Sequence, residues 1–173
     1  TPNPTGGLRH RRTGGQQPMI ETGEPAPPFA LTDATGERVT LEQLAGRDVV
    51  VYFYPRDDTP GCTKEACGFR DAWTELRQLG VEVLGVSPDS AESHARFAEK
   101  YGLPFRLLSD PDKRVMQAYG AWGEKISYGR KTTGVIRSTV WIGPDGRVRR
   151  HWPRIADAKA HPDQVLSALK GER

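Results

Sequence analysis

The chain has 173 residues, 36% of them hydrophobic and 27% charged, with two cysteines and a formal net charge of +3. This length is typical of one globular domain with its own core. No apolar run approaches the roughly 20 residues of a membrane helix, which excludes a membrane-spanning protein and predicts no membrane partner. Two cysteines are too few for the disulfide framework of a small secreted domain, and no apolar segment follows the N-terminal arginines as in a secretory signal. We therefore expect a cytoplasmic location.

The net charge comes from the N-terminal stretch. Residues 1–18 are rich in Gly, Pro and Thr and contain Arg9, Arg11 and Arg12 without any Asp or Glu, so the rest of the chain is formally neutral. We predict a flexible basic extension over 1–18, either a tag or an upstream segment, followed by one domain over 19–173. A nucleic-acid-binding role would depend on this stretch alone, so no nucleic-acid partner is expected.

The first predicted elements are two short strands and a buried strand. Phe29 to Leu31 and Arg38 to Thr40 flank a turn rich in Asp, Thr and Gly, which predicts an N-terminal β-hairpin, and Leu41 to Leu44 forms a helical turn. The β-branched and aromatic run from Val49 to Tyr54 is typical of a strand buried on both faces. Pro55 ends it, because proline has no amide hydrogen for a sheet.

A helix is predicted to begin at Thr59-Pro60, with threonine as its cap and proline in the first turn. Cys62 then lies in the first turn, where free backbone N–H groups and the helix dipole favour the thiolate, which is the nucleophilic form. The helix is expected to run to about Leu79, with Cys67 on it. Its apolar positions recur every three or four residues and form one core-facing stripe, Phe69, Trp73, Leu76 and Leu79.

Beyond Gly80, strand and helix patterns alternate, and a hairpin and a last helix follow. The predicted strands are Val81 to Val86, Phe105 to Leu108, Val135 to Ile142 and Val148 to Trp152, and the predicted helices are Ala91 to Tyr101, a segment ending at Tyr119, and one from His161 to about Leu169. The turn at 143–146 makes the last two strands an antiparallel pair. This order predicts an α/β domain in which helices cover a mixed sheet.

Two stretches resemble a known family. Pro55-x-x-x-Thr59-x-x-Cys62 matches the active-site signature of the peroxiredoxins, and TPGCTKEAC resembles their bacterioferritin comigratory protein (PrxQ-like) branch. WGEKISYGRKTTGVIRSTVWI, from Trp122 to Ile142, resembles a later part of the same family. The resemblance implies a thioredoxin-like fold, a mixed central sheet flanked by helices with an N-terminal β-hairpin.

The resemblance also implies roles for single residues. It makes Cys62 the peroxidatic nucleophile, with the Thr59 hydroxyl near its sulfur and Pro55 shielding the pocket. Arg137 matches the family's distal arginine, which supplies a permanent positive charge to thiolate and peroxide. Glu65 agrees with the family string and is expected to hydrogen-bond within the site. Peroxide is the implied substrate, and no metal or organic cofactor is implied.

Cys67 matches the position that often carries the resolving thiol in this branch. It would convert the Cys62 sulfenic acid to a disulfide, which thioredoxin, or glutaredoxin, would reduce. Five residues along an ideal helix separate two Cα atoms by roughly 8.6 Å, whereas a disulfide needs less than about 7 Å. The first helical turns must therefore unwind before the bond forms. Because both thiols lie in one chain, the chemistry needs no dimer, and a monomer is expected.

Two other functions are compatible with a cysteine pair. A thioredoxin-like protein disulfide oxidoreductase normally uses Cys-x-x-Cys, and the four-residue gap here argues against it. A redox sensor or holdase would use the unwinding of the helix as its signal, and would combine slow turnover with oxidation-dependent binding. The histidines form no triad signature and are predicted to be surface or packing residues, His10, His94, His151 and His161.

Overall fold

The computed structural model describes residues 20–127 and 129–171, so the extension predicted for 1–18 lies outside the described residues. The elements, in chain order, are β1 (Ala30–Asp33), β2 (Arg38–Thr40), the 3-10 helix η1 (Glu42–Leu44), β3 (Asp48–Phe53), α1 (Pro60–Asp71), α2 (Trp73–Gln78), β4 (Val81–Ser87), α3 (Ala91–Tyr101), β5 (Arg106–Ser109), α4 (Arg114–Ala118), β6 (Trp122–Ser127), β7 (Arg130–Val135), β8 (Ser138–Ile142), β9 (Val148–Trp152) and α5 (His161–Gly171).

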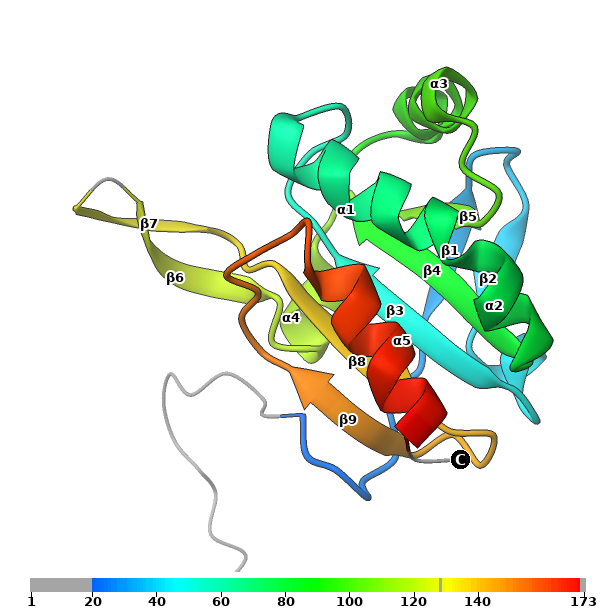
Figure 1. Cartoon of the computed structure of the whole chain (residues 1–173). Helices are drawn as coiled ribbons and strands as arrows, with labels where there is room; N and C mark the ends of the chain where they lie inside the picture. The colour runs from blue at the N-terminus through cyan, green and yellow to red at the C-terminus, as the bar shows by residue number, and fades with distance from the viewer. Residues whose placement is uncertain (1–19, 128, 172–173) are drawn as a thin grey trace, which may run out of the picture.

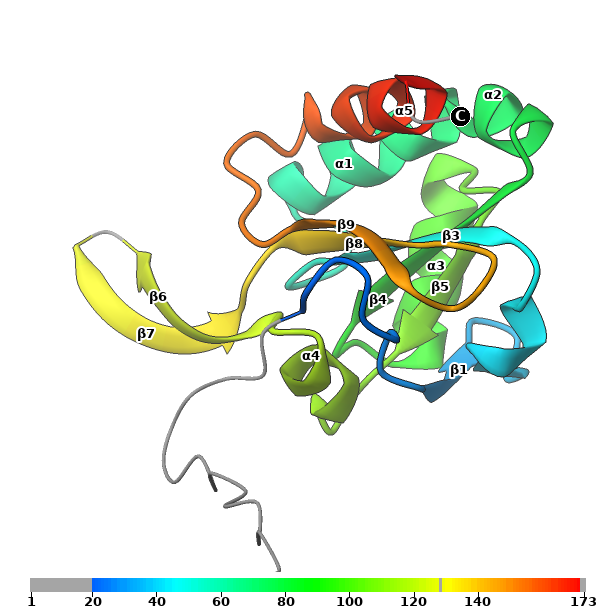
Figure 2. The same cartoon turned by 90° about the horizontal axis from the view of Figure 1, so that it is seen from below.

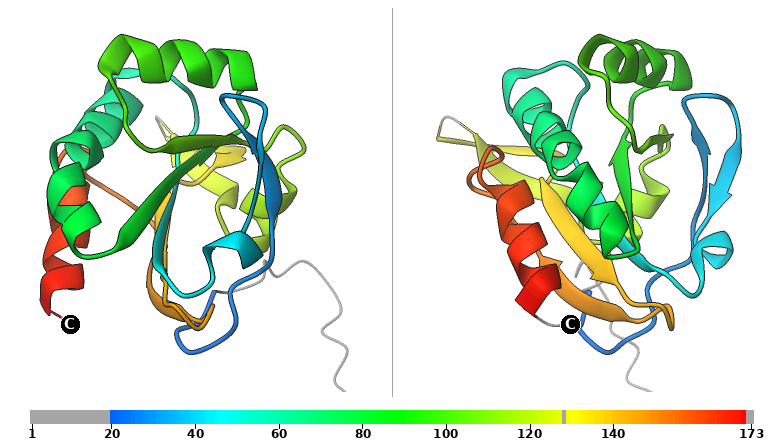
Figure 3. Two further views of the ribbon diagram at one scale, coloured as in Figure 1. Left: turned by 90° about the vertical axis from the view of Figure 1, so that its right-hand side faces the viewer. Right: turned by 45° about the vertical axis from the view of Figure 1, so that its right-hand side comes forward.

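A seven-stranded mixed sheet occupies the middle of the described chain, in the order β2-β1-β5-β4-β3-β8-β9. β3 and β5 both run parallel to β4, and the other neighbours are antiparallel. The predicted N-terminal hairpin is present as β1–β2, which forms one edge of the sheet on the side away from α5 (Figure 3). The predicted mixed sheet with flanking helices is confirmed.

Strand β3 lies in the interior of the sheet, between β4 and β8, and every one of its residues is buried. Val50 and Tyr52 point to one side of the sheet, into a core shared with α1, α2 and α5. Val51 and Phe53 point to the other side, into a core shared with α4. Side chains alternate along a strand, so a strand covered on both faces must be apolar throughout. The run predicted from Val49 to Tyr54 is therefore the interior strand β3, with bounds shifted by one residue.

Helices α1, α2 and α5 lie side by side on one face of the sheet (Figures 1 and 2). α1 and α5 are in close contact at Gly68, where an added Cβ would lie 2.6 Å from Pro162 Cγ. A side chain at that position would collide with the proline ring, so glycine permits the close packing of the two helices.

The helix predicted to run unbroken to Leu79 is divided into α1 and α2 at Ala72, which corrects that expectation. Ala72 has φ −88° and ψ −2°, at the edge of the right-handed helical region, while its amide still donates to Gly68 O and its carbonyl still accepts from Leu76 N. The apolar stripe survives the interruption, because Phe69 and Leu76 are both fully buried. The interruption thus changes the backbone locally without changing which face is covered.

The strand predicted from Val135 to Ile142 is also two strands. Val135 ends β7 and Ser138 begins β8, and between them Ile136 N donates to Ala121 O while Arg137 O accepts from Ile155 N. β6 and β7 form a separate two-stranded sheet that the sequence did not predict, and this hairpin projects from the body (Figures 1 and 2). Its exposed residues lack the alternation of a half-buried strand.

Candidate active site

The site is built where β3 ends and α1 begins. Pro55 is half-buried and follows Tyr54, just after the end of β3. Thr59 occupies the position that caps α1. Pro60 is the first helical residue, so Cys62 is the third residue of the first turn. The prediction of a cysteine at a helix N-terminus is confirmed, and the backbone N–H groups there favour an anion.

Cys62 is 1% exposed and contacts Arg137, which lies between β7 and β8. Arg137 Nη2 lies 3.2 Å from Cys62 Sγ in hydrogen-bond geometry. An added Cβ on Gly61 would lie 3.2 Å from the same nitrogen, so glycine leaves room for the guanidinium over the first turn. The structure thus brings together two predicted residues that are 75 positions apart in the sequence.

Glu65 holds the other side of the guanidinium. Its Oε1 accepts a hydrogen bond of 2.8 Å from Arg137 Nη1, and its Oε2 is buried without a hydrogen-bond partner among the described residues. Burial raises the pKa of Glu65 from 4.5 to about 7, although Arg137 acts in the opposite direction. Burial acts to lower the pKa of Arg137, but the neighbouring Glu65 and Cys62 raise it by more than burial lowers it. The net pKa of Arg137 is therefore raised, and the guanidinium stays charged.

The interruption between β7 and β8 gives Arg137 its position. Arg137 lies between the two strands, and its carbonyl accepts from Ile155 in the segment after β9. Thr139, two residues after Arg137, is paired with Tyr52 of β3, so the backbone that carries Arg137 leads directly into the strand beside β3. Arg137 therefore lies next to the element that leads to Cys62, and its side chain is 17% exposed.

Thr59 and Cys67 are close in sequence to Cys62 but make different contacts. Thr59 Oγ1 donates to Arg56 O over 3.0 Å, and the hydroxyl makes no capping bond to the helix. Its predicted closeness to the sulfur of Cys62 stays a prediction. Cys67 is half-buried and faces a hollow of about 500 Å³ between α1 and α5, whereas Cys62 faces the core. Both thiols are free.

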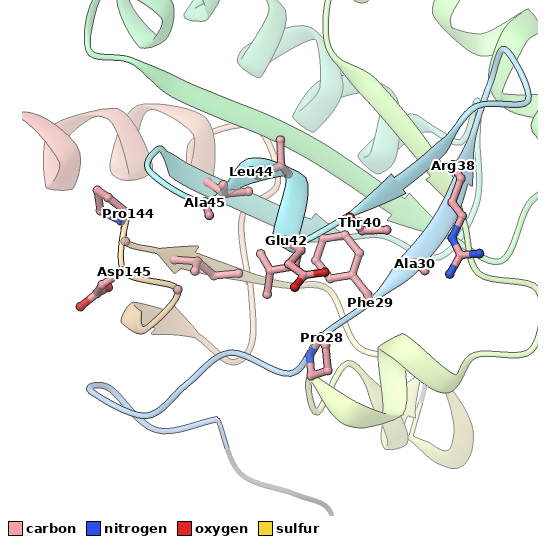
Figure 4. Close-up of a pocket in the computed structure, with 15 residues that line it drawn as sticks. Pro28, Phe29, Ala30, Arg38, Thr40, Glu42, Leu44, Ala45, Pro144 and Asp145 are labelled. Atoms are coloured by element: carbon pink, nitrogen blue, oxygen red, sulfur yellow. The ribbon is translucent and has the colours of Figure 1, made fainter.

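A hollow of about 700 Å³ lies elsewhere (Figure 4). It is bounded by the β1–β2 hairpin, η1 and the turn joining β8 to β9, and none of the five predicted site residues lines it. Val49, near the start of β3, contributes to it, whereas the loop to Cys62 follows the last residue of β3. The hollow and the thiol site are therefore at opposite ends of β3.

Comparison with known proteins identifies the family. Residues 22–151 match the AhpC/TSA family. The chain is 44% identical over 151 residues to peroxiredoxin Bcp of Escherichia coli, covering 87% of this chain and 96% of the relative. This chain belongs to the peroxiredoxins. The peroxiredoxin assignment and the predicted bacterioferritin comigratory protein branch are both confirmed.

Solved structures agree with the peroxiredoxin fold. A cysteine-to-serine variant of PrxQ from Xylella fastidiosa superposes with a TM-score of 0.82 at 32% identity, covering 92% of this chain and 99% of that one. The bacterioferritin comigratory protein of Xanthomonas campestris gives 0.78 at 39% identity, covering 83% and 91%. These matches confirm the predicted thioredoxin-like fold. Of the helices in residues 20–127 and 129–171, none has the length and apolarity needed to cross a bilayer.

The raised pKa of Glu65 predicts a pH-dependent stability for this peroxiredoxin. The folded protein holds a proton up to about pH 7 that the unfolded chain releases near pH 4.5, so the proton stabilises the folded state at low pH and this contribution is lost as pH rises through 7. Glu65→Gln carries no titrating proton. Relative to the variant, the parent is expected to lose about 3 kcal/mol of unfolding free energy between pH 4.5 and 8.

Urea unfolding of parent and Glu65→Gln at pH 4.5, 6, 7 and 8 measures this effect. The difference between the two proteins cancels the titrations that they share, such as that of His161, whose pKa burial lowers to about 4. An equal difference between parent and variant at all four pH values would contradict the assignment of the proton to Glu65.

Sequence reasoning missed part of the surroundings of this site. The contact of Glu65 with Arg137 has a sequence signal, because Cys62 and Glu65 are three residues apart and share one helix face. His161 is fully buried, and its Nε2 lies 2.8 Å from Thr139 Oγ1, within hydrogen-bond distance. This agrees with its predicted role as a packing residue. His10 lies outside the described residues. The surroundings of His94 have no sequence signal, because its partner is 37 residues away.

Proposed function

We propose that this peroxiredoxin reduces hydrogen peroxide and organic hydroperoxides with Cys62 as the nucleophile. The observation that carries the proposal is the contact of Arg137 Nη2 with Cys62 Sγ at 3.2 Å, in the first turn of α1. The bacterioferritin comigratory protein of Xanthomonas campestris has alkyl peroxide reduction activity, which supports organic hydroperoxides as substrates here. A fixed positive charge beside a helix N-terminus favours both the thiolate and the negative charge that moves to the leaving oxygen.

In the first step, the Cys62 thiolate attacks one peroxide oxygen. A sulfur–oxygen bond forms, the oxygen–oxygen bond breaks, and the second oxygen leaves as alkoxide or hydroxide and takes a proton. Sulfur is oxidised by two electrons to a sulfenic acid, and the peroxide is reduced to alcohol and water, or to two waters once the cycle is complete. We assign Arg137 to the developing charge, Thr59 to the alignment of the peroxide and Pro55 to the shape of the pocket.

In the second step, the Cys67 thiol attacks the Cys62 sulfenic sulfur, forms a disulfide and releases water. Cys62 and Cys67 are five residues apart on α1, which places them roughly 140° apart around the helix. The first turns of α1 must therefore unwind. A dithiol protein then reduces the disulfide by thiol exchange, and we assign this role to thioredoxin, with glutaredoxin as the alternative. Because the cycle is complete within one chain, we propose a monomer. We also propose a cytoplasmic location, which a redox-active cysteine pair fits.

Intact mass measured after sub-stoichiometric hydrogen peroxide tests this proposal. The reduced parent is expected to lose two hydrogens as Cys62 and Cys67 form a disulfide, whereas Cys67→Ser is expected to gain one oxygen on Cys62. Peptide mapping then locates each change. No rapid mass change in either protein would overturn the proposal and favour the protein disulfide oxidoreductase or the redox sensor.

A further inference from the structure

The loop that leads into α1 is tied to α3 through a buried carboxylate. Asp57 is 8% exposed, and its Oδ1 accepts a hydrogen bond of 2.5 Å from the Tyr54 hydroxyl. Its Oδ2 accepts from Ser93 Oγ over 2.8 Å and lies 2.7 Å from His94 Nδ1. Ser93 and His94 belong to the first turn of α3, where the helix dipole also favours a negative charge.

The hydrogen bonds of His94 determine which of its nitrogens carry protons. His94 is 0% exposed, and its Nε2 lies 3.0 Å from the carbonyl oxygen of Leu108, which can only accept. Nε2 therefore donates. Nδ1 faces Asp57 Oδ2 at 2.7 Å, the same oxygen that accepts from Ser93 Oγ. Asp57 and His94 are therefore joined by a buried hydrogen bond, and we call them the Asp57–His94 pair.

Two further contacts attach the same loop. The Asp57 amide donates to Asp89 Oδ2 over 2.8 Å, at the end of β4. Asp58 has φ +58°, a strained value for a residue with a side chain, and its carboxylate accepts from Lys100 Nζ and Tyr101 Oη, each over 2.7 Å. Asp58 is exposed, so its ion pair with Lys100 contributes little to stability.

The Asp57–His94 pair lies outside the reacting groups. Among the hydrogen bonds of the described residues, none joins it to Cys62, Glu65 or Arg137. Yet Asp57 precedes the cap residue of α1 by only two positions and Cys62 by five. The conformation of this short loop therefore determines where the first turn of α1 lies relative to Arg137.

We propose that Asp57 and His94 are positioning residues that hold the first turn of α1 in its reactive place and oppose its unwinding. In this role the pair favours attack of Cys62 on peroxide, because that step needs the turn intact. It disfavours attack of Cys67 on the sulfenic acid, because that step needs the turn opened. The inference rests on the proposed function, and it identifies α3 as the element that sets the balance between the two steps.

Stopped-flow tryptophan fluorescence, with mass measurement on quenched samples, separates the two steps. The phase that depends on peroxide concentration reports sulfenic acid formation, and the phase independent of it reports disulfide formation. Asp57→Asn is expected to slow the first step roughly tenfold and to accelerate the second several-fold, because a population shift toward the open turn acts on the two steps in opposite directions. A purely structural loss of stability would slow the first step without accelerating the second.

Two further variants make the test specific. Asp48→Asn is the matched control, since Asp48 is similarly buried at 6% exposure, accepts a hydrogen bond from Trp141 Nε1 over 3.0 Å, and lies at the start of β3, at the end away from Cys62. It is expected to leave both rates within about twofold of the parent. Ser93→Ala removes one bond to Asp57 without leaving a charge unpaired, and is expected to give the same opposite changes on a smaller scale.

The outcomes separate this inference from the proposed function. A parent that forms the disulfide, with Asp57→Asn and Ser93→Ala rates that equal the parent's or fall together, would overturn the positioning role alone. A parent that forms no disulfide with peroxide would overturn the proposed function, and this inference with it. If Asp57→Asn fails to fold, Ser93→Ala decides, by the direction of its two rates.

Discussion

Cys62→Ser is expected to lower the rate of peroxide reduction by roughly 10³-fold or more, because a serine hydroxyl is not ionised at neutral pH and cannot replace a thiolate as nucleophile. Fold and stability are expected to change little, since serine differs from cysteine by one buried atom. Peroxide consumption in the presence of a dithiol reductant measures the effect, and circular dichroism checks the fold.

Cys67→Ser is the matched control for that experiment, since it removes the other thiol of the same helix. It is expected to retain the first turnover at the parent rate and to accumulate the sulfenic acid. Retention of more than a tenth of the parent rate by Cys62→Ser would mean that the peroxide nucleophile lies elsewhere in the chain.

Arg137→Met is expected to lower the second-order rate constant of sulfenic acid formation on the order of 10²-fold. The substitution removes the hydrogen-bond donor 3.2 Å from Cys62 Sγ and the positive charge beside it. It also leaves Glu65 buried without the arginine that lowers its pKa, so that pKa rises further and the protein is expected to be less stable at high pH, where the unpaired carboxyl must ionise. The rate is therefore measured at pH 6, with urea unfolding to show that the variant is folded.

Arg137→Lys separates charge from shape. Lysine keeps the charge, but a single ammonium cannot reproduce the fork with which Arg137 contacts Cys62 and Glu65 together, so an intermediate loss of roughly tenfold is expected. Arg130→Met, on an exposed arginine of neighbouring β7, serves as the control and is expected to behave as the parent. Equal rates for Arg137→Met and the parent would remove Arg137 from the mechanism.

The sequence predicted the elements whose residues carry a burial pattern. The run from Val49 to Tyr54 is apolar throughout because both of its faces are covered, and it corresponds to the interior strand β3. The β6–β7 hairpin was missed because Arg130 to Thr133 are exposed, so its pairing comes from backbone hydrogen bonds and a turn at Gly129 with φ +77°. The interruption at Ala72 was missed because the apolar stripe continues across it.

The same distinction applies to the site. Cys62 and Thr59 could be placed at a helix start from local sequence, and Arg137 through the family resemblance. The Asp57–His94 pair could not be predicted, because two polar residues 37 positions apart are each typical of a surface. Only the fold shows that both are buried and face each other. Pairing between distant polar residues depends on the packing of elements, which periodicity does not reveal.

The close contact of Gly68 with Pro162 separates α1 into two parts with different freedom. The part that follows Gly68 is held by α5 and carries Phe69, which is fully buried. The part that precedes it carries both cysteines. In the proposed cycle, each turnover therefore opens the part of α1 before Gly68, which contributes Cys62 and Ala66 to the core, while the part held by α5 stays in place. The catalytic motion is then a local opening, and it does not require global unfolding of the domain.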